Sequence, residues 1–236
     1  MTLGAEVHLS DNHLIDLLPR VERKRLLALC EPVAMELHDI LVEADSEPLH
    51  VWFPRTGFIS LIATLDGTSS LEVGMVGREG MLGTHVALGC PVAPQKALVQ
   101  GTGTAWRIGN EPFCAELARS PGLRRVLDRY LYVLMAQFAG TAACLRFHQI
   151  GERLARWLLM SQDRAQSAQF HVTHEFLAYM LGVRRVGVTM AAASLQRQGL
   201  ITYRRGELTV NDRAGLEQAA CSCYAVQRGA YRSLLG

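Results

Sequence analysis

The stretch that decides the fold is residues 173–210, which read THEFLAYMLGVRRVGVTMAAASLQRQGLITYRRGELTV. Thr173 is a good N-cap for a helix over residues 175–181, because its hydroxyl can accept a hydrogen bond from the first turn. Gly182 ends that helix, since glycine adopts the left-handed conformation that other side chains resist. A second helix is predicted over residues 184–198. Two helices joined by a tight glycine turn are typical of a helix-turn-helix.

Directly after these helices the pattern changes to extended structure. Gly199 closes the second helix, and residues 200–203 and 208–210 are short apolar runs around the basic sequence Arg204-Arg205-Gly206-Glu207. A hairpin in this position is a wing. We therefore predict a C-terminal winged helix-turn-helix with a basic wing tip.

The residue types in this stretch suit DNA. A recognition helix lies in the major groove and presents its N-terminal residues to base edges. Arg185 can bridge O6 and N7 of guanine, whereas Arg184 and the wing arginines are expected to contact phosphate. The predicted DNA-binding residues are Thr173, Arg184, Arg185, Val186, Thr189, Met190, Tyr203, Arg204 and Arg205.

Charge is divided unevenly along the 236 residues, whose net charge is +2. Residues 1–145 hold 12 basic and 16 acidic side chains, whereas residues 146–236 hold 12 arginines, no lysine and 6 acidic side chains. The C-terminal third is thus suited to an anionic partner. On charge alone, an arbitrary surface bias explains the asymmetry equally well.

Upstream, the apolar spacing of residues 10–30 predicts a helix. From Val33 onward, short apolar runs alternate with turn residues, and Asp66-Gly67 is a hairpin signal. The runs cover residues 33–42, 49–53, 57–64, 70–76, 97–100 and 104–108. Several strands at such spacing, with no helix between them, indicate an antiparallel barrel or jelly roll.

After a short helix over residues 111–119, Pro121 suits the first position of a long helix that ends near Phe147. Its apolar side chains alternate steps of four and three, as in a coiled-coil seam. The seam consists of Leu127, Leu131, Leu134, Phe138, Thr141 and Leu145. We predict that it forms a dimer contact; burial against the chain's own barrel is the alternative.

A further helix is predicted over residues 150–162, with apolar side chains on one face and Arg153, Arg156 and Arg164 on the other. The chain is therefore expected to be α+β. Its predicted domains are a β-rich domain with N-terminal helices (1–119), a dimerisation helix (120–147) and the winged helix-turn-helix (148–236).

Several classes of site and protein are disfavoured. The six cysteines include no C-x2-C pair and are expected to be free thiols, and His171-x-x-His174 lacks further ligands at a telling spacing, so no metal is predicted. The sequence contains no P-loop and no Ser-His-Asp order, so nothing in it indicates an enzyme. Because there is no apolar run long enough for a membrane span and no basic segment of a signal peptide at the N-terminus, we expect a cytoplasmic protein.

The chain as a whole resembles the Crp/Fnr superfamily of bacterial transcription regulators. The glycine-rich turn at residues 77–83, the long helix and residues 173–201 carry the resemblance. It implies an N-terminal cyclic-nucleotide-binding-like β-roll, a dimerisation helix and a C-terminal winged helix. It also implies homodimers that bind a palindromic promoter site in double-stranded DNA and contact RNA polymerase.

The departures from the family bear on cofactors. In cyclic-AMP-binding members, a glutamate holds the ribose and an Arg-Ser pair holds the cyclic phosphate; here these positions fall near Thr84 and Ala93-Pro94, which cannot do so. Residues 1–29 lack the cysteine cluster of oxygen-sensing members. His85 and His38 are conceivable axial ligands of a haem, but surface or loop histidines are favoured. We predict no cofactor, leave the effector open and do not expect cyclic AMP to bind.

The leading hypothesis is a homodimeric, sequence-specific DNA-binding regulator. Arg185 occupies the family's base-reading arginine position. Val186 and Met190 replace the glutamate and arginine of the cyclic-AMP type, so the operator sequence should differ. The alternative is a small-molecule or cyclic-nucleotide sensor whose winged helix contacts protein rather than DNA.

Overall fold

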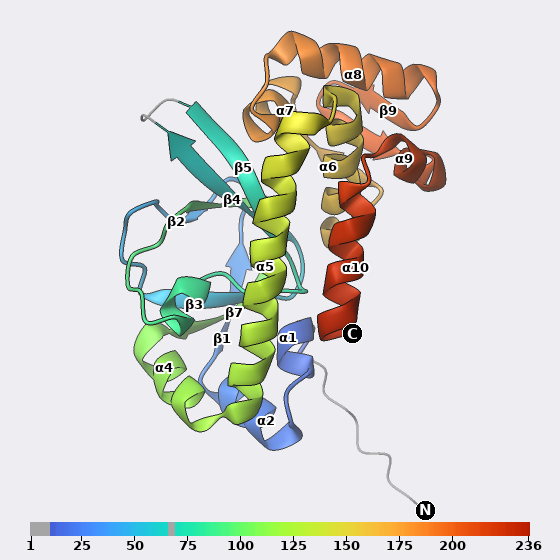
Figure 1. The fold of residues 1–236 in the computed structure, drawn as a ribbon. Helices are drawn as coiled ribbons and strands as arrows, with labels where there is room; N and C mark the ends of the chain where they lie inside the picture. Colours follow the sequence, from blue (N-terminus) through green and yellow to red (C-terminus); the bar gives the residue numbers. More distant parts are fainter. Residues whose placement is uncertain (1–9, 66–68) are drawn as a thin grey trace, which may run out of the picture.

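The computed structural model describes residues 10–65 and 69–236 (Figure 1). The predicted hairpin turn at Asp66-Gly67 lies outside this part, although the strands on either side of it pair antiparallel. Within the described residues no single helix has the length and apolarity to cross a membrane. The helices His174–Leu181 and Arg185–Arg197 together have that length and apolarity, but they are bent by 110° relative to each other.

The helix predicted over residues 10–30 is two helices, α1 (His13–Asp16) and α2 (Arg20–Ala28). The break lies at Pro19, which has no N–H to donate and clashes with the preceding turn. Asn12 caps α1, and its side-chain amide donates to the backbone carbonyls of Pro54 and Gly80 at 2.8 and 2.9 Å. The N-terminal segment is thereby fastened to the β-strands.

The predicted jelly roll is confirmed as a β-roll of two antiparallel sheets. In the described part of the chain, one sheet has the strand order β1-β7-β3 and the other β2-β6-β4-β5. The strands are β1 (Glu31–Met35), β2 (Ile40–Val42), β3 (His50–Pro54), β4 (Phe58–Leu65), β5 (Ser69–Val76), β6 (Lys96–Gly101) and β7 (Gly103–Gly109). The run predicted over residues 33–42 is thus two strands, separated by a turn in which His38 has φ +71°.

Both sheets share one apolar core, to which β3 contributes Phe53 and β4 contributes Ile59. Two helices close the β-roll: α4 (Asn110–Arg119), which buries Phe113 in this core, and the unpredicted one-turn helix α3 (Thr84–Ala87). The core gives the β-roll a rigid wall for the long helix that follows.

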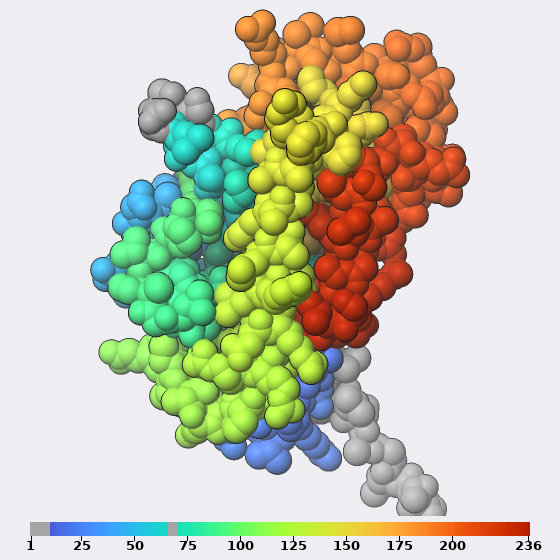
Figure 2. Space-filling view, in the orientation of Figure 1, coloured from blue at the N-terminus to red at the C-terminus, as the bar shows by residue number. Residues whose placement is uncertain are grey.

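The predicted long helix is present as α5 (Pro121–Phe147), whose 27 residues span about 40 Å along the β-roll (Figure 1). Tyr130 of α5 packs against Gly80, where an added Cβ would lie 2.1 Å from the Tyr130 hydroxyl oxygen. Only glycine permits this approach. A last helix, α10 (Cys223–Leu235), lies beside α5 and runs in the opposite direction (Figures 1 and 2).

Helix α6 (Ile150–Ala165) corrects the prediction of an arginine-lined polar face. All residues from Arg153 to Ser161 are buried, including Arg156. The helix is enclosed because α8 (Arg185–Arg197) and α9 (Arg213–Ala219) pack on it, with further contacts from α7 (His174–Leu181), α10 and β4. Sequence periodicity could not show how many neighbours the helix would have.

The predicted winged helix-turn-helix is confirmed in α7, α8 and the hairpin of β9 (Ile201–Arg204) and β10 (Glu207–Val210). The wing is larger than predicted. A third strand, β8 (Gln169–His171), pairs with β10 and gives the order β8-β10-β9. The segment between α6 and α7 is therefore partly a strand.

A buried carboxyl group joins the β-roll to α6. Glu72 of β5 accepts hydrogen bonds from the Ser60 hydroxyl at 2.6 Å and from the Trp157 indole at 3.0 Å. Burial raises the pKa of Glu72 to about 7. The two hydrogen bonds and the nearby arginines lower this pKa, but their effect is smaller than that of burial. The native chain therefore holds this proton more tightly than the unfolded chain does.

Linkage predicts how Glu72 affects stability. Because the folded pKa lies above the unfolded value of 4.5, its contribution to stability is full below about pH 4.5 and is lost as pH rises through about 7. We expect Glu72→Gln, which is neutral at every pH, to be more stable than the parent at pH 8 by about 1–3 kcal/mol and similar to it at pH 5. Urea unfolding at both pH values measures this. The exposed Glu36→Gln is the control, and an equal response of both variants would contradict the prediction.

Candidate nucleic-acid interface

The turn between α7 and α8 is built as the sequence predicts. The Thr173 side chain accepts a hydrogen bond from the Phe176 N–H, and Gly182 has φ +61°. The buried guanidinium of Arg153 donates to the carbonyl of Leu181 at the end of α7. A cation at a helix C-terminus is favourable because the last carbonyls carry partial negative charge. Arg153 therefore stabilises the turn that sets the orientation of α8.

Helix α8 has one buried and one exposed face. Its buried side chains are the predicted ones, Val188, Ala191, Ala192 and Leu195. Val186 and Met190, on the opposite face, are 64% and 69% exposed. Apolar side chains so exposed at the start of a recognition helix can contact the methyl group of thymine.

The two arginines at the start of α8 are exposed, Arg184 at the N-cap and Arg185 in the first turn. Thr189, one turn on, is also exposed, and its hydroxyl contacts the Arg185 carbonyl and the His174 ring, both at 3.1 Å. Among the described residues, neither arginine has an acidic ion-pair partner. Which base or phosphate each contacts stays a prediction.

The wing presents two further arginines. Arg205 and Gly206 form the tip with φ +54° and +87°, a pair of positive φ values typical of a tight two-residue hairpin. Arg204 and Arg205 are both exposed. Between the wing and α8 lies an open hollow of about 380 Å³, lined by His171, Thr173, His174, Glu175, Arg185, Tyr203, Arg205 and Gly206.

Tyr203, one of the predicted DNA-binding residues, also makes contacts within the domain. Its hydroxyl donates to the Val172 carbonyl at 3.0 Å, and its ring stacks on His174 with centroids 4.3 Å apart. Burial, followed by the charge of Arg185, lowers the pKa of His174 and so favours the neutral imidazole. We infer that Tyr203 and His174 hold the wing against α7 and α8. No spacing in the sequence indicates this contact of His174, because stacking partners can lie at any separation along the chain.

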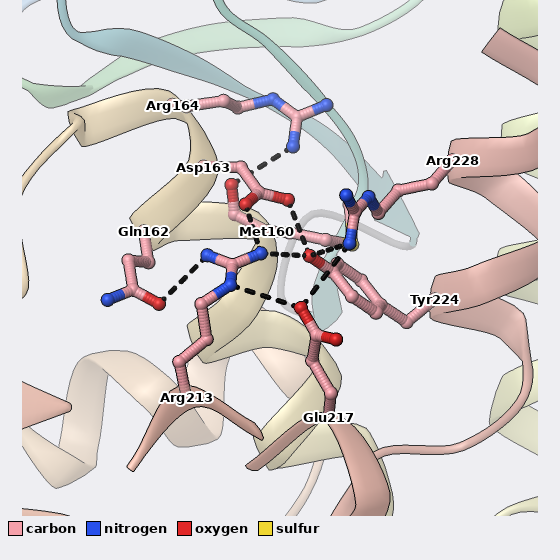
Figure 3. A network of polar contacts seen from close by, with 8 residues as sticks. All are labelled: Met160, Gln162, Asp163, Arg164, Arg213, Glu217, Tyr224 and Arg228. Atoms are coloured by element: carbon pink, nitrogen blue, oxygen red, sulfur yellow. Dashed lines mark hydrogen bonds and ion pairs between the residues drawn. The ribbon is translucent and has the colours of Figure 1, made fainter. Parts of the chain in front are cut away.

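A polar network fastens this region to the rest of the chain (Figure 3). Arg213 at the start of α9 donates to Gln162 at 3.0 Å and to Asp163 at 2.7 Å, both on α6. Asp163 also accepts from the Tyr224 hydroxyl of α10 at 2.8 Å. Three helices therefore meet at one guanidinium.

A second candidate site is a cavity of about 270 Å³ between the β-roll and α5. It contains the positions expected to hold ribose and phosphate in cyclic-AMP-binding relatives, namely Thr84 and Ala93-Pro94. The rest of the lining is largely apolar and, among the described residues, includes no lysine or arginine; it consists of Val42, Leu61, Met81, Leu82, Gly83, His85, Leu88, Gln95, Leu131, Leu134, Met135 and Phe138. His85 is therefore a cavity residue rather than a surface one, and burial lowers its pKa.

The predicted dimer seam lies mostly against the chain itself. Leu127, Leu134 and Thr141 are buried within the single chain, and Leu131, Phe138 and Leu145 are half-buried. Phe138 packs on Gly74 of β5. The alternative, burial against the chain's own barrel, thus describes where these side chains lie, and their part in a dimer stays a prediction.

Away from the interface, one group of side chains among the described residues could hold a metal. Cys144, His148, Cys221 and Cys223 have ligand atoms within 4.8 Å of one another. Spacing did not reveal the group because Cys221 comes 77 positions after Cys144.

Residues 152–219 match the family described as Crp-like helix-turn-helix domain. FixK2 from Bradyrhizobium japonicum is 14% identical over 81% of this chain and 98% of its own, with a TM-score of 0.69. The c-di-GMP-responsive regulator CLP of Xanthomonas campestris is 17% identical, and the match covers 82% of this chain and 100% of CLP with a TM-score of 0.67. A Crp/Fnr-family regulator from Thermus thermophilus is 21% identical, and the match covers 80% of this chain and 98% of that regulator with a TM-score of 0.64. No curated protein matches the chain.

A winged helix-turn-helix with an exposed basic recognition helix, on a β-roll and a long helix, makes the chain a DNA-binding transcription regulator. Residues 152–219 match the Crp-like helix-turn-helix domain, and the chain has the fold of Crp/Fnr-family regulators. The resemblance predicted from the sequence is thus confirmed.

The exposure of Arg185 and of the wing arginines leads to a prediction about base reading. On an operator selected from randomised duplexes, Arg185→Ala should cost about 1–3 kcal/mol and relax the preference at one base pair per half-site. Arg204→Ala or Arg205→Ala should weaken all sequences alike and lower the salt slope by about one. Affinities for single-base operator variants measure both effects, with Arg197→Ala at the far end of α8 as the control. If Arg185→Ala weakened every sequence equally, Arg185 would be a phosphate contact only.

The apolar cavity leads to a prediction about cyclic AMP. A cyclic phosphate transferred from water into this lining would have no cationic partner, so we expect no binding at micromolar concentrations. Isothermal titration calorimetry with the full chain measures this. A dissociation constant in the micromolar range or below would contradict the prediction.

Proposed function

We propose that the chain binds a palindromic promoter site as a homodimer and regulates transcription there, in contact with RNA polymerase in the cytoplasm. The exposed N-terminal end of α8, with Arg184 and Arg185 free of ion pairs among the described residues, is the observation that carries this proposal. The chain would act as a regulator rather than an enzyme. Residues 1–119, 120–147 and 148–236 would be its sensor, dimerisation and DNA-binding parts.

The proposed dimer contact uses the open face of α5. Its exposed side chains alternate steps of four and three, the spacing of a coiled-coil seam, one position on from the predicted seam: Asp128, Tyr132, Met135, Ala139, Ala142 and Arg146. Tyr132 and Met135 are 62% and 68% exposed. The small alanines toward the C-terminal end would let two helices approach closely. A two-fold axis here would place two recognition helices in successive major grooves, about 34 Å apart.

The proposed sensor part is the β-roll, whose cavity would take the effector. Because its lining is mostly aliphatic with Phe138, and because its polar groups are few, we infer a small and largely apolar ligand. Such a ligand would touch α5 at Leu131 and Leu134, which belong to the helix that carries the proposed dimer contact.

One experiment tests both the DNA partner and the dimer. The parent chain should bind a selected palindrome far more tightly than its single half-site, with affinity that falls steeply as salt rises. Met135→Asp places a charge in the proposed contact without entering the core, so it should yield monomers that bind palindrome and half-site alike. Light scattering and binding isotherms measure this, with Leu49→Asp on an exposed loop as the control.

Two outcomes would contradict the proposal. A tight dimer in Met135→Asp would place the dimer contact elsewhere. The absence of any salt-dependent duplex binding by the parent would favour the alternative, in which the winged helix contacts a protein.

A further inference from the structure

Three cysteines and one histidine from distant parts of the sequence meet where α5 ends. Cys144 lies in the last turn of α5 and His148 follows the helix directly, while Cys221 lies in the connection between α9 and α10 and Cys223 is the first residue of α10. The Sγ atoms of Cys144 and Cys221 are 3.5 Å apart, and Cys223 Sγ lies 3.6 Å from His148 Nδ1. All four ligand atoms lie within 4.8 Å of one another.

These separations are those of ligands around one metal ion. Zinc binds thiolate sulfur at about 2.3 Å and histidine nitrogen at about 2.0–2.1 Å in a tetrahedron. Two sulfur ligands of such a site are therefore about 3.8 Å apart, and a sulfur and a nitrogen about 3.5 Å. A polynuclear iron–sulfur cluster would spread its ligands further, because sulfide and a second iron lie between them.

An independent observation comes from the charge beside the cluster. Arg156 is 8% exposed, and its Nη1 lies 3.9 Å from Cys144 Sγ. Its other hydrogen bonds go to the neutral Thr141 hydroxyl and Gln227 amide oxygen, both at 3.1 Å. Among the ion pairs of the described residues, none involves Arg156.

A buried guanidinium without a counter-charge is costly. Three thiolates, a neutral histidine and one divalent ion together carry a single negative charge. Such a centre next to Cys144 would therefore balance Arg156. Three free thiols would supply no such balance, and the nearby carboxyl group of Glu72, whose pKa burial raises to about 7, makes no ion pair with Arg156.

We propose that Cys144, His148, Cys221 and Cys223 bind one zinc ion in a closed, tetrahedral site. With four protein ligands the site has no open position and is structural. It joins the end of α5 and the start of α6 to the segment that leads from the helix-turn-helix domain into α10. The ion thereby fixes the joint between the long helix and the DNA-binding part, and this inference does not depend on which DNA the chain binds.

The test begins with the full-length chain purified without chelator. Mass spectrometry of the elements should find one zinc per chain. After exchange to cobalt, the d–d bands of tetrahedral coordination and a sulfur-to-cobalt charge-transfer band should appear. Cys221→Ser and Cys223→Ser should lose metal at least tenfold more readily to a competing chelator. The matched control, Cys90→Ser with Cys114→Ser, removes two exposed cysteines outside the cluster and should leave zinc unchanged.

A ligand exchange separates coordination from folding. His148→Cys should keep one metal per chain and strengthen the charge-transfer band in proportion to the added thiolate. Metal-free chain with all six thiols open to a thiol reagent would overturn the proposal. So would a Cys144–Cys221 disulfide in the purified chain, or iron and sulfide with their visible absorbance in place of zinc.

Discussion

The complete burial of α6 is the constraint on which the arrangement of the C-terminal half depends. Leu154, Ala155, Leu158 and Leu159 are fully buried in a core that also contains side chains of β4 and β5. Each large apolar side chain in that core contributes roughly 1.5–3 kcal/mol. The helix-turn-helix is therefore packed on the β-roll through α6 rather than tethered by a linker. This gives the recognition helix a defined direction.

Burial of α6 imposes a second requirement, because the helix carries polar side chains into the core. Two of them have partners on other elements: Arg153 donates to the end of α7, and Trp157 donates to Glu72 of β5. At the exposed end of α6, Asp163 accepts from Arg213 and Tyr224. Buried polar groups with partners specify one arrangement of neighbours, since any other leaves them unpaired. The polar contacts thus fix the orientation that the apolar core leaves less defined.

The cavity in the β-roll and the interface on α8 are joined by continuous packed structure. The cavity is lined by α5, whose end leads into α6, and α6 supports α8. A ligand can shift such a structure only by binding two arrangements of it with different affinity. The joint between α5 and α6, with the cysteine and histidine cluster at its side, is the element whose geometry both sites share.

Local signals in the sequence determined much of the DNA-binding part. Thr173 and Gly182 set the ends of α7 through their own capping geometry, and the exposed arginines of α8 follow from its small-residue face. These features depend on neighbours a few residues away. The alternation of apolar runs predicted the β-roll for the same reason, although it joined β1 to β2. In the N-terminal segment, the apolar spacing of residues 10–30 did not show that the helix breaks at Pro19.

What only the tertiary structure decided depends on contacts between distant residues. The spacing of Leu127, Leu131 and Leu134 showed an apolar stripe on α5 but not which surface would cover it, and the β-roll covers it. Arg153 and Arg156 were expected on an open face because the sequence cannot count the helices that enclose α6. Cys144 meets Cys221 only because α9 leads the chain back to the end of α5. Helical periodicity records which side chains share a face; the partner of that face is set by how all the elements pack together.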